Sequence, residues 1–173
     1  MSGPRVLVAG VGNVFLSDDG FGVAVAERLA GMDLPEGVEA ADFGIRGVHL
    51  AYQLLDGYDA LVLVDALDLG GEPGTVAVFE PDLTAFEAPA AVDGHSLDPA
   101  AVLATLRRLG GSVNRVVVVG CQPATVEEGM GLSPAVAAAV EPAAAEAVRL
   151  AAAAAVVPVP AGPDPAPVHG GAE

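Results

Sequence analysis

Short apolar runs alternate along this chain with segments of helical periodicity. Phe21, Val25 and Leu29 recur at i, i+4 and i+8, which predicts a helix face, and Gly31 follows as the stop. Further helices are predicted over residues 47–55, 98–109 and 133–150, and strands over residues 6–10, 38–43, 60–65 and 113–120.

Residues 75–80 predict one more strand, because polar and apolar positions alternate there after a turn cluster at residues 70–74. We expect this strand to return antiparallel to the strand at residues 60–65, as a hairpin. The order β-α-β-α-β-β-α-β-α favours an α/β fold with helices on both faces of a mostly parallel sheet and one antiparallel strand. One domain over residues 1–156 and a disordered Pro/Ala/Gly-rich tail over residues 157–173 are expected.

Composition narrows the class of protein. The 173 residues carry 23 acidic and seven basic side chains, a net charge of -16 without a basic stripe, which argues against nucleic acid or an anionic membrane as partner. The single cysteine, Cys121, excludes an intrachain disulfide and a multi-cysteine zinc site. We find neither an apolar stretch of about 20 residues nor an export signal, so a cytoplasmic protein is expected.

Acidic and imidazole side chains follow the predicted strands. Asp18 and Asp19 come after the first strand, Asp65 ends the most apolar strand, and His95 lies in the loop after the expected hairpin. Ligands of open α/β sheets bind beyond the carboxyl ends of the strands. Two carboxylates and one imidazole suit a divalent ion such as nickel or zinc, with positions left open for water or substrate.

Simpler interpretations exist for each motif taken alone. Acids such as Asp18 and Asp19 are also typical of a helix N-terminus. Asp65 is equally typical of a residue that caps the helix or turn after its strand, and His95 of an ordinary loop. Gly10-x-Gly12 suggests a dinucleotide-binding turn, but Phe15 replaces the third glycine, so no nucleotide cofactor is expected.

Six motifs in register, spread over residues 5–150, resemble the maturation endopeptidases of nickel-iron hydrogenases. The first motif joins residues 8–13 with residues 18–22. The other five are residues 42–47, residues 63–66, residues 93–95, residues 121–123, and Glu127 with residues 131–133. The resemblance implies an α/β/α sandwich around a five-stranded sheet. It also implies an enzyme that removes a C-terminal peptide from the large-subunit precursor once nickel has been inserted.

The resemblance further implies site residues. Asp19, Asp65 and His95 match the family's nickel contacts, and Asp42 matches an aspartate with a role in cleavage. The first contact is usually glutamate in the family, so the choice between Asp18 and Asp19 stays open. Cys121 occupies an apolar position and is expected to be buried. The precursor is the expected partner of a monomeric enzyme.

The mechanism is a hypothesis, because the sequence contains neither a Gly-x-Ser-x-Gly elbow nor a His-Glu-x-x-His helix. We expect the enzyme's ligands to complete the coordination of nickel held mainly by the precursor's cysteines, so that the ion serves recognition. Whether a metal-bound water also attacks the peptide stays open. The alternative from another class is a non-catalytic, metal-dependent chaperone of the precursor.

Overall fold

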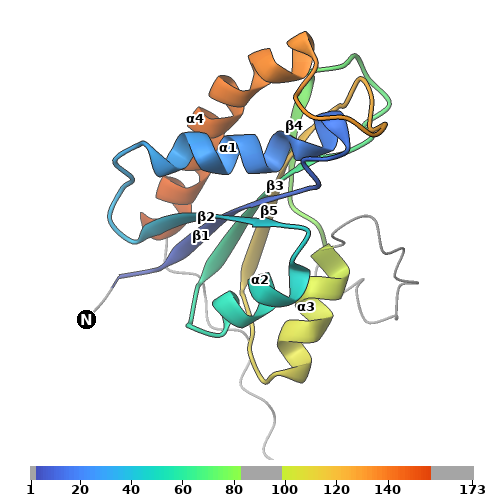
Figure 1. Ribbon diagram of the computed structural model, residues 1–173. Coiled ribbons are helices and arrows are strands. Elements are labelled where there is room, and N and C mark those ends of the chain that lie inside the picture. The colour runs from blue at the N-terminus through green and yellow to red at the C-terminus, as the bar shows by residue number, and fades with distance from the viewer. Residues whose placement is uncertain (1–2, 83–98, 157–173) are drawn as a thin grey trace, which may run out of the picture.

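The computed structural model describes residues 3–82 and 99–156 and shows a five-stranded sheet between two layers of helices (Figure 1). The predicted α/β/α fold is confirmed. The strand order is β2-β1-β3-β5-β4, and only β4 runs antiparallel to its neighbour. The strands are β1 (Val6–Val11), β2 (Val38–Gly44), β3 (Ala60–Ala66), β4 (Val76–Phe79) and β5 (Arg115–Cys121).

Two helices cover each face of the sheet. Helices α1 (Phe21–Ala30) and α4 (Pro134–Val156) lie on one face, and α2 (Gly47–Leu54) and α3 (Pro99–Arg108) on the other (Figure 1). A short 3₁₀ helix, η1 (Ser17–Gly20), leads directly into α1. Within the described ranges, no helix has the length and apolar character that crossing a bilayer requires.

The central strands are apolar on both sides because both sides are covered. In β1, Val6 and Val8 pack toward α1 and α4, whereas Leu7 and Ala9 pack toward α2 and α3. Successive side chains of a strand point to opposite faces, so an uninterrupted apolar run is typical of a strand buried between two helix layers.

One predicted pairing is wrong. Strand β4 follows β3 in the chain but does not form a hairpin with it, because β5 lies between the two and pairs with both. The sheet places β5 parallel to β3 and leaves β4 at the outer edge. A strand's neighbour is decided by the packing of the whole sheet, which the local alternation at residues 75–80 does not contain.

The topology brings the carboxyl ends of β1, β2, β3 and β5 to the same edge of the sheet. The loops that leave these strands therefore meet there. The expected tail at residues 157–173 lies outside the described residues.

Candidate active site

Two carboxylates meet around Gly12 at this edge. Asp65 is the penultimate residue of β3, and Asp19 lies in η1. Gly12 has a φ of 141°, and a Cβ built there would lie 1.9 Å from the Asp19 carbonyl oxygen and 3.8 Å from Asp65 Oδ1. Only glycine fits between the two segments, so this residue allows the two acids to approach each other.

Asp65 is a buried carboxyl with a strongly shifted affinity for its proton. Only 7% of the residue is exposed. Burial, followed by the negative charge of Asp19, raises the pKa of Asp65 to about 8, although a hydrogen bond from the Ala66 backbone N–H acts in the other direction. A buried carboxyl whose ionisation is opposed by a neighbouring negative charge forms a site at which a cation is favourable.

Asp18 and Asp19 are neighbours in sequence but have different partners. Asp18 is fully buried and accepts hydrogen bonds from the backbone N–H groups of Ala124, Thr125 and Ser133 and from the Ser133 hydroxyl, at 2.7–3.2 Å. Burial raises the pKa of Asp18, but these hydrogen bonds outweigh burial and leave it below its ordinary value. Asp18 therefore fastens the loop after β5 to η1.

Asp19 is left to face the site. Its Oδ2 accepts one hydrogen bond, from the Asn13 backbone N–H at 2.8 Å, and its charge acts on Asp65. The geometry thus favours Asp19 over Asp18 as a metal ligand.

Asp42 lies beside this acid pair at the end of β2. It is exposed, pairs in register with Gly10 of β1, and accepts a hydrogen bond from the Gly44 backbone N–H at 2.8 Å. Gly44 in turn lies close to Gly12, whose carbonyl oxygen would be 3.9 Å from a Cβ at position 44. Asp42 therefore borders the site without being buried in it.

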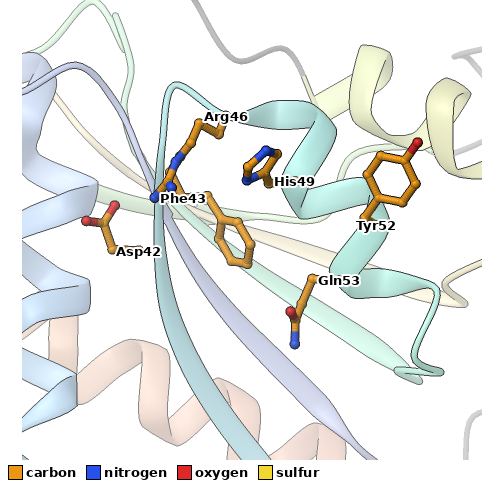
Figure 2. A pocket seen from close by; sticks show the side chains of 6 residues that line it. All are labelled: Asp42, Phe43, Arg46, His49, Tyr52 and Gln53. Carbon is orange, nitrogen blue, oxygen red and sulfur yellow. The ribbon is translucent and has the colours of Figure 1, made fainter.

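Two cavities flank Asp42, and both are lined by Asp42 and Arg46. One, of about 310 Å³, lies toward α2 (Figure 2) and the other, of about 370 Å³, lies toward α1. The first is lined by Asp42, Phe43, Arg46, His49, Tyr52 and Gln53, and the second by residues 12–15, Val23, Asp42 and residues 44–46. The cavities form a candidate binding region next to the acid pair.

The structure brings together some of the predicted residues. Asp19 and Asp65 meet, and Asp42 lies nearby, whereas His95 lies outside the described residues. In residues 3–82 and 99–156 alone, no three histidine, cysteine or acidic side chains are grouped closely enough to hold a metal ion.

Cys121 is fully buried, as expected, and burial followed by the charge of Asp18 raises the pKa of its thiol to about 11. A thiol that stays protonated at neutral pH is a poor nucleophile, so Cys121 belongs to the core.

Sequence analysis assigned no role to Arg46 or His49. Both line the cavity next to Asp42. Their position directly after the strand that ends at Gly44, three residues apart at the start of a helix, was the available signal.

Comparison with known proteins identifies the family. Residues 23–150 match the family model HycI, described as hydrogenase maturation protease. The hydrogenase expression/formation protein HupD of Rhodobacter capsulatus is 40% identical over 140 residues, which cover 79% of this chain and 66% of that protein. The hydrogenase 2 maturation protease of Escherichia coli is 35% identical over 145 residues, covering 80% and 85% of the two chains.

Solved structures agree. The hydrogenase maturating endopeptidase HybD of Escherichia coli matches with a TM-score of 0.68 at 33% identity, over 82% of this chain and 88% of that one. The [NiFe] hydrogenase maturation protease HycI of Thermococcus kodakarensis matches with a TM-score of 0.65 at 27% identity, over 87% and 94%. The family model and these relatives show that the chain is a peptidase with an α/β/α fold. The chain belongs to the hydrogenase maturation protease family.

Proposed function

We propose that this peptidase removes a C-terminal peptide from the nickel-loaded large-subunit precursor of a nickel-iron hydrogenase, in the cytoplasm. The observation that carries the proposal is the pair formed by Asp19 and the buried Asp65 at the carboxyl edge of the sheet. A divalent ion presented by the substrate would take the place of the Asp65 proton and neutralise both carboxyl groups. The family's described activity, maturation of hydrogenases, supplies the substrate class.

Nickel belongs to the substrate in this proposal. Asp19, Asp65 and His95 provide two oxygens and one nitrogen and no thiolate. Three such ligands leave coordination positions that the precursor's own groups fill. The protease thus recognises a precursor in which nickel is already in place.

Asp42 is the proposed catalytic residue. Its carboxylate is exposed and lines both cavities. We assign it the role of general base: it accepts a proton from the attacking water and returns that proton to the amine that leaves when the peptide bond breaks.

A single experiment separates this function from its alternatives. Chelator-treated enzyme is incubated with nickel-loaded and with nickel-free precursor, and the mass of the large subunit is measured. We expect a mass loss only with the nickel-loaded precursor. A chaperone leaves both masses unchanged. A conventional metallopeptidase is inactive after chelation, recovers with zinc, and cuts both precursors.

A further inference from the structure

Strand β2 offers an open edge next to Asp42. Among the described residues it is the last strand on its side of the sheet and pairs with β1 alone. The Gly37 carbonyl accepts the Val6 N–H at 2.8 Å, and backbone groups along a strand alternate between its two sides. Glu39 and Ala41 therefore bond to β1, which leaves the N–H and C=O groups of Ala40 and Asp42 facing outward.

No backbone group in residues 3–82 or 99–156 pairs with Ala40 or Asp42 on that outer side. An edge with free donors and acceptors is a template for another extended chain.

The two cavities lie on opposite faces of the sheet at the end of this edge. Figure 2 shows Asp42 on one side of β2 and Phe43, His49 and Gln53 on the other. Consecutive side chains of a strand added to β2 would point alternately to these two faces. One residue of such a strand would enter the cavity toward α1, and the next residue would enter the cavity toward α2.

The linings of the cavities differ in chemistry. Val14, Phe15, Val23 and Ile45 line the cavity toward α1, which suits an apolar side chain. Arg46, His49 and Gln53 line the cavity toward α2 together with Asp42, and Arg46 and Asp42 also border the other cavity. The donors of Arg46, His49 and Gln53 suit a group that accepts hydrogen bonds.

Arg46 is available for a ligand. In the part of the chain that the structure describes, ion pairs with glutamates are formed by Arg5, Arg28, Arg115 and Arg149. Arg46 instead donates from Nε to the Phe43 carbonyl at 3.3 Å, and no ion pair joins it to an acidic side chain of the described residues. In a chain with a net charge of -16, an arginine beside a cavity without a carboxylate partner favours an acidic group from the ligand.

We propose that the polypeptide substrate binds as an additional strand on the edge of β2, with an apolar side chain in the cavity toward α1 and a carboxylate side chain of the adjacent residue on Arg46. This inference rests on the proposed function, because the bound strand is the part of the precursor that carries the scissile bond. It places that bond beside Asp42 and makes Arg46 a specificity-determining residue.

The test uses fluorescein-labelled ten-residue peptides of Ala and Ser that differ only at their centre: Leu-Glu, Leu-Lys and Leu-Ser-Glu. Leu-Glu puts its two side chains on opposite faces, whereas Leu-Ser-Glu puts them on one. We expect Leu-Glu to bind about tenfold more tightly than either other peptide, as loss of one charge-assisted hydrogen bond implies. The chain's overall negative charge acts in the other direction, since it attracts the lysine peptide.

Two variants examine the edge and the arginine. Ala40→Pro removes an outward N–H and should abolish binding of all three peptides, while Val78→Pro, at an outward-facing position of the opposite edge strand β4, should leave binding unchanged. Arg46→Glu should reverse the preference from Leu-Glu to Leu-Lys, which a misfolded variant cannot do. In the wild type, amide exchange at Ala40 and Asp42 should slow when Leu-Glu binds.

Equal affinity for Leu-Glu and Leu-Ser-Glu, no binding at millimolar peptide, or unchanged exchange at Ala40 and Asp42 would each overturn the inference. None of these measurements involves nickel or cleavage. Failure of the proposed function, seen as an uncut nickel-loaded precursor, is therefore a separate result.

Discussion

At the scale of one residue, the buried carboxyl of Asp65 lowers the stability of the fold at neutral and higher pH. The free energy of unfolding depends on pH wherever a group binds its proton differently in the folded and unfolded chain. With a folded pKa of about 8 against an ordinary value of 3.8, Asp65 keeps a proton that the unfolded chain releases. The contribution of Asp65 to the free energy of unfolding is therefore most favourable below about pH 4 and is lost as the pH rises to about 8.

Asp65→Asn should consequently stabilise the free protein at pH 8 and not at pH 4, since asparagine has the shape of the protonated acid and no charge. The shift of about four pKa units, at about 1.4 kcal/mol per unit, sets an upper limit of about 6 kcal/mol, and we expect a gain of at least about 2 kcal/mol, or about 4–8 °C in Tm, at pH 8. Thermal unfolding followed by circular dichroism at both pH values measures it. An equal gain at both pH values would show that charge is not the cause.

Asp18 has the opposite effect on stability. Its folded pKa is lowered, so its contribution is present above the unfolded value near pH 4 and disappears as the pH falls through the folded value. Asp18→Asn places an amide group against four donors and should cost about 2–4 kcal/mol at pH 7.

The matched control for Asp18→Asn is Asp19→Asn, because Asp19 accepts a single backbone hydrogen bond from the residues that the structure describes. In urea unfolding at pH 7, we expect Asp18→Asn to lose much more free energy of unfolding than Asp19→Asn. At pH 3 the difference between the two variants should be smaller. Similar losses for both variants would contradict the structural role given to Asp18.

At the scale of elements, the approach of α1 to the sheet sets the position of η1 and hence of Asp19. Gly22 lies in the first turn of α1, and a Cβ there would lie 2.2 Å from the Val64 carbonyl oxygen and 2.3 Å from that of Val11. Backbone atoms of two strands cannot move aside as a flexible side chain can. The helix can pack this closely only because the residue is glycine.

Gly22→Ala should therefore push α1 away from β1 and β3 and destabilise the protein by about 1–3 kcal/mol. The control is Gly31→Ala at the other end of the same helix, where φ is -91° and the nearest atom is 3.8 Å away. Thermal unfolding should show a loss for the first variant and almost none for the second. A Gly22→Ala protein with unchanged Tm would mean that the helix tolerates a longer distance from the sheet.

Elements and their order were predictable from the sequence, because buried strands and amphipathic helices leave a local signature. The strand at residues 60–65 and the helix after Gly20 were found where the structure has them. The partner of β4 was not predictable, since pairing with β5 depends on a strand that follows 36 residues later in the chain.

The meeting of Asp19 and Asp65 followed from a general rule about strand ends. The distinction between Asp18 and Asp19 did not. Both are consecutive acids of η1, and only the donors of the loop after β5 give them different surroundings. The cavities shared by Asp42 and Arg46 were equally out of reach, because they form between segments that no sequence pattern joins.

At the scale of the whole molecule, the proposed ligands come from three separate parts of the chain: η1, the end of β3, and the loop that sequence analysis assigns to His95. Such a set is assembled only by the complete fold and, in the proposed function, only when a precursor supplies the ion. Recognition should then depend on the difference between nickel-loaded and nickel-free precursor rather than on affinity for either alone.

His95→Ala should remove that difference. We expect wild-type enzyme to bind the nickel-loaded precursor more tightly than the nickel-free one, and the variant to lose about tenfold or more of this preference, because a lost interaction with a charged group is worth about 1.5–3 kcal/mol. Binding of the nickel-free precursor and the Tm should not change, since the sequence predicts a loop position for His95, where a side chain contributes little to a core. The control is His169→Ala, in the segment predicted to be a tail. Titration of each precursor against surface-bound enzyme measures both affinities. If His95→Ala weakens the two precursors equally, the histidine serves general binding and nickel is not what this protease recognises through it.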